Sequence, residues 1–157
     1  MTLHALRLKP AEEAFGIEAA GRLLFSSLPP WMQDLGLLVE AVETGRPAGA
    51  PADWQPGAVI RLPFSKRVSR NGLLCPQALL AAAETAMTVA CAAALNGYQP
   101  ISIADQTMHF VRPVSFDVLA DARVVRIARN TSFGRVTLTS AIDHRPVGMV
   151  NCAYAIL

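Results

Sequence analysis

Charged and aromatic residues are both scarce in this chain of 157 residues. Only 17% of the residues are charged and 6% are aromatic, whereas 52% are hydrophobic and the formal net charge is +2. Such an apolar composition excludes intrinsic disorder as the main state, and the chain is long enough to bury a sizeable core. The small net charge, with no basic stripe, argues against a nucleic-acid partner. The excess of apolar surface must then be covered by a membrane or by a subunit interface.

Cysteine and histidine are too few and too scattered to suggest a metal centre. The cysteines are Cys75, Cys91 and Cys152, and no CxxC pair occurs. Because a structural zinc site needs four such ligands at close spacing, we expect no metal and no cofactor, and we interpret the cysteines as buried thiols of a reducing cytosol. The N-terminal segment has no continuous apolar stretch, and Glu12 and Glu13 come early. We therefore expect no signal peptide and a cytoplasmic location.

The longest apolar run, residues 78–95, is just long enough to raise the question of a membrane span. It consists mostly of alanine, and Glu84 lies inside it. An acidic group near the centre of a bilayer is costly, and alanine offers little to offset that cost. The run therefore predicts a buried helix and no membrane contact.

The order of the predicted elements is typical of an α+β protein, in which an antiparallel sheet wraps around one long central helix. We expect a single domain, with a helical lead-in and loop over residues 1–57 and the core over residues 58–157. The expected elements are helices at 11–28 and 31–44, a loop rich in Gly and Pro at 44–57, a strand at 58–65 that Pro63 would place at a sheet edge, a helix at 76–96, and a meander of strands at 101–114, 118–129, 135–142 and 147–157.

Polar residues form one stripe along the central helix, at Gln77, Glu84, Thr88 and Cys91. A buried carboxylate costs several kcal/mol unless it is paired or hydrogen-bonded, so Glu84 needs a reason to be there. One interpretation is that the stripe lines a groove, with the positive end of the helix stabilising developing negative charge. The other is that Glu84 and Thr88 face a dimer interface or solvent.

The segment NGLLCPQALLAAAETAM, followed by ADQTMHFVRPV and two alternating strands, resembles the PaaI-like thioesterases of the hotdog fold. In that family a glycine, two spacer residues and a His-Gly-Gly triplet lead into the helix, and an acid follows the His by nine residues. Gly72 matches the glycine, Cys75-Pro76-Gln77 occupies the triplet, and Glu84 matches the acid. The segment from Phe110 to Pro113 matches a frequent F-x-R-P sequence.

The resemblance implies hydrolysis of an acyl-CoA thioester to a carboxylic acid and CoA. Glu84 would act as general base or as nucleophile, and a backbone N–H at the helix start would polarise the thioester carbonyl. Thr88, one turn after the acid, matches a threonine that helps to position water. The residues expected to contact the substrate are Ser69, Cys75, Pro76, Phe110 and Arg112. The family also implies a homodimer or homotetramer, in which the acid of one chain faces residues of the next.

Three positions depart from the family pattern. Pro76 replaces the glycine that usually supplies the oxyanion N–H, and proline has no N–H to give. Losing one such donor typically lowers the rate about a hundred- to a thousandfold. The backbone N–H or the side-chain amide of Gln77 could substitute for it. Ser69 stands where many relatives have Asn or Gln, and Asn71 could serve instead. Cys75 replaces the His.

Two alternative functions remain open from the sequence. Cys75, at the start of a helix, could be a nucleophile assisted by Glu84 or His109. Alternatively, the chain is a non-catalytic hotdog module that binds acyl-CoA or serves assembly, because Pro76 removes the usual donor. Arginines that could reach the CoA phosphates are Arg112, Arg126, Arg129 and Arg135, although surface arginines are usually just solvated.

Overall fold

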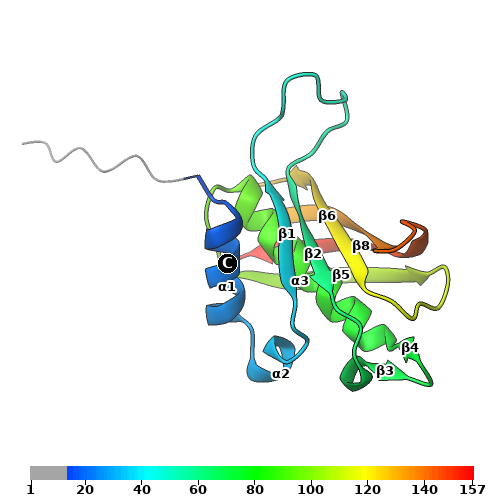
Figure 1. Cartoon of the computed structure of the whole chain (residues 1–157). Helices are drawn as coiled ribbons and strands as arrows, with labels where there is room; N and C mark the ends of the chain where they lie inside the picture. The colour runs from blue at the N-terminus through cyan, green and yellow to red at the C-terminus, as the bar shows by residue number, and fades with distance from the viewer. Residues whose placement is uncertain (1–13) are drawn as a thin grey trace, which may run out of the picture.

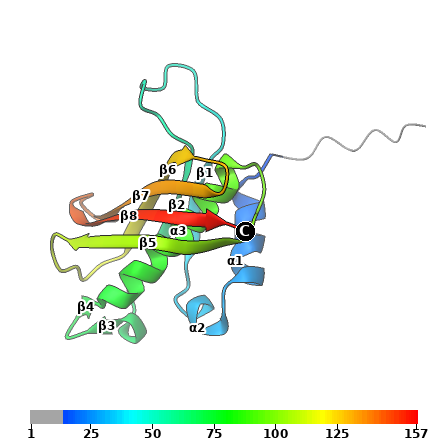
Figure 2. The same cartoon turned by 180° about the vertical axis from the view of Figure 1, so that it is seen from behind.

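A strongly curved antiparallel sheet of six strands surrounds the long helix α3, as Figure 1 and Figure 2 show from opposite sides. The computed structural model describes residues 14–157. Its helices are α1 (Ile17–Ser27), α2 (Pro30–Gln33) and α3 (Pro76–Ala94), with a 3-10 turn at Lys66–Val68. Its strands are β1 (Leu38–Glu43), β2 (Gly57–Leu62), β3 (Ser69–Arg70), β4 (Leu73–Leu74), β5 (Ile101–Phe110), β6 (Val118–Ile127), β7 (Thr131–Ser140) and β8 (Pro146–Ile156).

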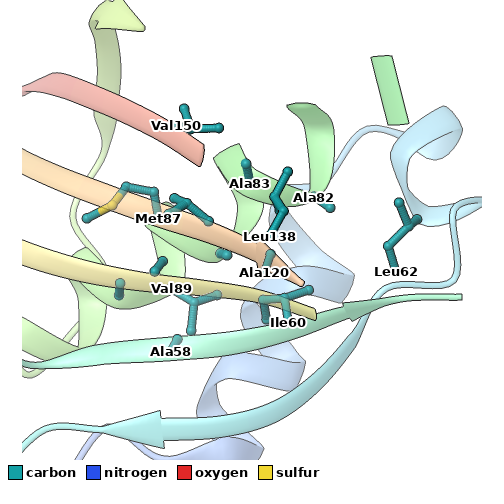
Figure 3. Close-up of a cluster of buried hydrophobic side chains, with 14 of the residues drawn as sticks. Ala58, Ile60, Leu62, Ala82, Ala83, Met87, Val89, Ala120, Leu138 and Val150 are labelled. Carbon is teal, nitrogen blue, oxygen red and sulfur yellow. The ribbon is translucent and has the colours of Figure 1, made fainter. Parts of the chain in front are cut away.

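The helix α3 is the core of the molecule. Alanine dominates it, so the sheet can approach its backbone closely, and larger side chains such as Met87 and Val89 fill the remaining space (Figure 3). By length and composition α3 could cross a membrane, but 72% of its most apolar window is buried inside the protein. The prediction of a buried helix, made for residues 76–96, is therefore confirmed, and the helix ends at Ala94.

The order of strands in the sheet is β1-β2-β6-β7-β8-β5. The predicted meander of four strands is correct for β6, β7 and β8 and wrong for β5, which pairs with β8 and not with β6. Strand β5 thus forms one edge of the sheet. The helix α3 packs closely against β2, β6 and β7 and much less closely against β8 and β5. The inner face of the sheet is therefore least covered by α3 at the β5 edge.

Two predictions for the first half of the chain are wrong. The helix expected at 31–44 ends at Gln33, and Leu38–Glu43 form the edge strand β1, which pairs with β2. The strand expected at an edge, β2, lies between β1 and β6, because Pro63 falls just after its last residue and so removes no ladder hydrogen bond. The helix predicted at 11–28 begins at Ile17, and its residues 11–13 lie outside the described range.

The predicted loop between β1 and β2 has no regular structure and extends beyond the sheet (Figure 1). At its base, Arg123 on β6 forms ion pairs with Glu43 on β1 and with Asp121. Its side chain crosses β2 at Gly57, where a Cβ atom would collide with Arg123 and with the backbone of Ala122. Hydrogen bonding to Arg123 lowers the pKa of Glu43. The glycine thus lets an arginine connect the two strands on either side of β2.

Candidate active site

The chain enters α3 through a small hairpin formed by β3 and β4. Asn71 and Gly72 occupy its tip with φ values of 54° and 75°, the left-handed conformation that a two-residue hairpin turn requires. Two backbone hydrogen bonds then fix the approach to the helix, from Leu74 N–H to the Val114 carbonyl and from Cys75 N–H to the Val68 carbonyl, both at 2.9 Å. The hairpin therefore places Asn71 beside the first turn of α3.

A cavity of about 630 Å³ lies between this hairpin, the first turn of α3 and the segment after β5. Its walls are mainly apolar, as is typical of small-molecule sites. Six of the residues singled out in the sequence line it, namely Asn71, Cys75, Pro76, Gln77, Phe110 and Arg112. Ser69, Glu84 and Thr88 are not among its lining residues. Most of the predicted site is thus brought together, but the acid lies outside the cavity.

The first turn of α3 offers one free backbone donor. Pro76 is the first helical residue and has no N–H, and the N–H of Ala78 donates to the Cys75 carbonyl at 3.1 Å. Between them, the N–H of Gln77 has no acceptor within residues 14–157. Free N–H groups at a helix N-terminus point out along the axis and favour negative charge. Gln77 is thus the residue in the altered triplet whose N–H can polarise a carbonyl.

The carboxylate of Glu84 is half-buried and has no partner. Within the described part of the chain it accepts no hydrogen bond and forms no ion pair. Burial raises its pKa above the ordinary value of 4.5, because removal from water disfavours the charged form. A carboxyl group that is partly desolvated and unpaired is suited to take up a proton, so Glu84 has the properties of a general base.

The remaining members of the polar stripe are progressively less accessible. Gln77 is exposed, Glu84 and Thr88 are half-buried, and Cys91 is buried, where its thiol lies 3.4 Å from the hydroxyl of Ser132 on β7. Burial raises the pKa of Cys91, so it stays protonated at neutral pH. Only the first part of the predicted stripe therefore borders open space.

The structure gives little support to a nucleophilic Cys75. The residue caps the N-terminus of α3 and is half-buried, but its side chain makes no capping hydrogen bond. His109, its proposed assistant, is exposed on β5 and is not among the residues that line the cavity.

Sequence reasoning missed Arg70, which lines the cavity next to Asn71. The sequence does point to Arg70, because it directly precedes the Asn71-Gly72 turn. Only the pairing of β3 with β4 shows that it lines the same cavity as Asn71.

Comparison with known protein families finds a match over part of the chain. The model of the family described as the thioesterase superfamily matches residues 78–147. No curated protein matches the sequence.

Solved structures give the fold independently. A protein from Pseudomonas aeruginosa has a TM-score of 0.73 at 23% identity, covering 90% of this chain and 98% of that one. A thioesterase from Haemophilus influenzae has a TM-score of 0.72 at 18% identity, covering 93% of each chain. The PaaI protein from the phenylacetic acid degradation operon of E. coli has a TM-score of 0.71 at 14% identity, covering 90% of this chain and 93% of that one.

The structural likeness, at these low identities, establishes the fold, and the family match covers most of α3 together with β5, β6 and β7. The predicted α+β hotdog fold and the resemblance to PaaI-like proteins are both confirmed. Over residues 78–147, a little under half of the chain, the sequence is thus similar to the thioesterase superfamily.

Proposed function

We propose that this protein is an acyl-CoA thioesterase in which Glu84 is the base or nucleophile and the backbone N–H of Gln77 polarises the thioester carbonyl. One observation carries the proposal: among residues 14–157, one face of α3 presents an N–H without an acceptor and a carboxylate without a partner. These are the two groups that acyl transfer to water requires.

The chemistry needs no further acid. With Glu84 as base, the carboxylate removes a proton from water, and the water oxygen attacks the carbonyl carbon. The Gln77 N–H stabilises the negative charge that develops on the carbonyl oxygen. The C–S bond then breaks, and CoA leaves as a thiolate, which is a good leaving group without prior protonation. Since burial raises the pKa of Glu84, it is a stronger base near neutral pH than an exposed glutamate.

The two groups cannot act on the same carbonyl within one chain. Gln77 and Glu84 are seven residues apart, which is about 10 Å along a helix axis. The N–H of Gln77 also points toward the N-terminal end of α3, away from Glu84. A substrate carbonyl bound to that N–H is thus beyond the reach of a water held by Glu84 of the same chain. We therefore propose a homodimer in which Glu84 faces the first turn of α3 of a second copy.

The edge strand β5 is where a second copy would attach. Its backbone is unpaired on one side, it is largely exposed, and α3 covers the inner face of the sheet least at this edge. Unpaired strand edges are templates for pairing with another chain. Such a pair would also cover exposed apolar side chains on and next to β5, such as Ile103, Phe110 and Val111. A cytoplasmic location and a further pairing into a tetramer stay predictions.

Pro76 favours a second candidate function, that of a non-catalytic module that binds acyl-CoA. Its position as the first residue of α3 leaves the Gln77 N–H as the one donor of the altered triplet. A site with a single donor can bind a carbonyl oxygen and still stabilise the transition state poorly.

The test is an assay of the purified protein against short, medium and aryl acyl-CoAs, with release of free thiol as the readout. We expect hydrolysis by the wild type, and a rate at least about a hundredfold lower for Glu84→Gln. The matched control is Glu18→Gln, which changes an exposed glutamate on α1. If Glu84→Gln hydrolyses as fast as the wild type, the assignment of Glu84 is wrong. If no thioester is hydrolysed but acyl-CoA raises the melting temperature, the protein is a binding module.

A further inference from the structure

Two arginines line the cavity beside the first turn of α3, and none of the described residues that line it with them is acidic. Arg70 lies on β3 and Arg112 in the segment after β5, and the other lining residues are uncharged. A mainly apolar cavity with two guanidinium groups carries a net positive charge. It therefore favours a ligand that is apolar along its length and anionic at one end.

The fold does not use the two guanidinium groups for ion pairs of its own. Arg61 and Arg123 each form ion pairs with two carboxylates. Neither Arg70 nor Arg112 forms an ion pair within residues 14–157. A guanidinium group is a planar fork of N–H donors that matches a carboxylate, so both arginines are available to a carboxylate from outside the chain.

One acid of the chain senses the charge of Arg112 but does not neutralise it. A backbone hydrogen bond from Arg145 lowers the pKa of Asp143 most, and the charge of Arg112 adds to this effect. Asp143 lies outside the cavity, and its carboxylate pairs with Arg145 at 3.4 Å. The positive charge inside the cavity is therefore left without a counter-charge from this acid.

Backbone hydrogen bonds hold both arginines at the cavity. Arg70 belongs to the hairpin of β3 and β4, which lies beside the start of α3 (Figure 1). The N–H of Arg112 donates to the Val147 carbonyl at 3.3 Å, which ties its segment to β8. The Leu74 N–H donates to the carbonyl of Val114, which ties the same segment to the hairpin. The two arginines thus line the cavity from two segments that hydrogen bonds connect.

The size of the cavity distinguishes between the two anionic parts that an acyl-CoA can have. A sphere of the cavity's volume is about 11 Å across, so the Gln77 N–H and the two arginines, which all line it, lie within that range. The pantetheine arm places the nearest CoA phosphate roughly 16 Å from the thioester sulfur when the arm is extended. A carboxylate at the far end of an acyl group of about five to seven carbons lies about 5–8 Å from the carbonyl carbon. With the carbonyl at Gln77, the arginines are thus within reach of a carboxylate on the acyl group and not of the phosphates.

We propose that Arg70 and Arg112 select acyl groups that end in a carboxylate, so that the substrates are CoA thioesters of dicarboxylic acids. This inference rests on the proposed function for the thioester and adds to it the class of acyl group. The free carboxylate accepts hydrogen bonds from the guanidinium groups, and the methylene chain packs against apolar lining residues such as Leu79 and Phe110. Because the arginines bind the end of the acyl group that does not react, they determine specificity and take no part in the chemistry.

The experiment compares glutaryl-, adipoyl- and pimeloyl-CoA with pentanoyl-, hexanoyl- and heptanoyl-CoA in the thiol-release assay. We expect kcat/KM of the wild type to be at least about tenfold higher for the dicarboxylic series, the usual effect of a hydrogen bond to a charged group. Arg70→Gln and Arg112→Gln should each remove most of this preference. The matched control is Arg67→Gln, which changes an exposed arginine outside the cavity and should keep the preference. A wild type that hydrolyses both series equally well would overturn the proposal.

Acyl-pantetheines distinguish the acyl carboxylate from the CoA phosphates, because they lack the nucleotide and its phosphates. The preference for the dicarboxylic series should persist in these shorter substrates and should again be lost in Arg70→Gln. If Arg70→Gln instead slows both acyl-CoA series equally and leaves the acyl-pantetheines unaffected, the arginines bind CoA phosphates and the proposal is wrong.

A binding measurement decides the inference even if no thioester is hydrolysed and the proposed function fails. Thioether analogues, in which a methylene group replaces the thioester carbonyl, cannot be cleaved. By calorimetric titration, we expect the analogue with a terminal carboxylate to bind the wild type at least about tenfold more tightly than the analogue with a terminal methyl group. Arg70→Gln should remove this difference. Equal affinities of the two analogues for the wild type would overturn the proposal.

Discussion

The hydroxyl of Thr88 donates a hydrogen bond to the backbone carbonyl oxygen of Glu84 at 3.1 Å, one turn earlier on α3. This bond uses the Thr88 hydroxyl proton and holds the hydroxyl oxygen on the face of α3 that carries the Glu84 side chain. Toward a water molecule held by the carboxylate, the hydroxyl oxygen can then act only as a hydrogen-bond acceptor. Thr88 is thereby suited to orient water and not to bind the carboxylate directly.

Replacing Thr88 with valine removes the acceptor and keeps the shape of the side chain. We expect kcat for thioester hydrolysis to fall about five- to tenfold, the usual effect of one lost hydrogen bond. Thr85→Val is the matched control, because Thr85 makes the same bond to the Ala81 carbonyl at 2.8 Å but is buried in the core. An equal loss of activity in both variants would point to a general effect on the helix and not to water positioning.

The pH dependence of activity and stability follows from the raised pKa of Glu84. As a base it must be ionised, so kcat/KM should fall on the acid side around a pKa clearly above 4.5. The folded protein binds this proton more tightly than the unfolded chain, so the burial penalty is absent below pH 4.5 and grows as the pH rises through the folded pKa. Glu84→Gln should therefore be more stable than the wild type at pH 8 and equally stable near pH 4. Thermal unfolding at both pH values checks this, and equal melting temperatures at pH 8 would contradict it.

Pro76→Ala supplies the N–H that the altered triplet lacks. Alanine is a good helix former, so the first turn of α3 should be retained while a second donor is added beside Gln77. We expect kcat to rise at least about tenfold, since one oxyanion donor is typically worth a hundred- to a thousandfold in rate. Pro30→Ala is the control, because Pro30 also begins a helix but does not line the cavity. If kcat does not change, the missing N–H does not limit the reaction.

Gly57→Ala tests the crossing of Arg123 over β2. A methyl group at this position collides with the backbone of Ala122 and with the Arg123 side chain, so the ion pair with Glu43 must shift. We expect a loss of about 1–3 kcal/mol in the free energy of unfolding, typical of overpacking. Gly45→Ala is the control, because a Cβ atom there meets no neighbour. Denaturant unfolding measures both, and equal stability of the two variants would show that the crossing is unimportant.

Much of the fold could be predicted because α3 and the last three strands carry clear periodic patterns. The error at β1 has a specific cause: Leu38, Val39 and Val42 are spaced like one face of a helix, and pairing with β2 overrides that spacing. The position of β5 could not be read from its sequence, because strand order depends on which partners are available in three dimensions.

The candidate site, like the fold, could be predicted from the sequence only in part. The residues at the start of α3 could be placed from their order, because the helix and the Asn71-Gly72 turn fix them locally. The role of Gln77 depends on which backbone N–H groups lack an acceptor after folding, and the sequence does not record that. The separation of Gln77 from Glu84 along α3 follows from helix geometry alone. The conclusion that the two groups cannot act on one carbonyl within a chain also depends on the direction in which the free N–H points.

Complementation between two inactive variants tests whether two copies share one site. Glu84→Gln removes the base, and Gln77→Pro removes the N–H at a position in the first turn where proline is tolerated. Each variant alone should be nearly inactive. A mixed dimer, isolated with two different affinity tags, would join the intact Glu84 of one chain to the intact N–H of the other, so one of its two sites is restored. We expect about half the wild-type activity for the mixed dimer. A mixed dimer as inactive as its parents would contradict a site shared between Glu84 and Gln77 of two copies.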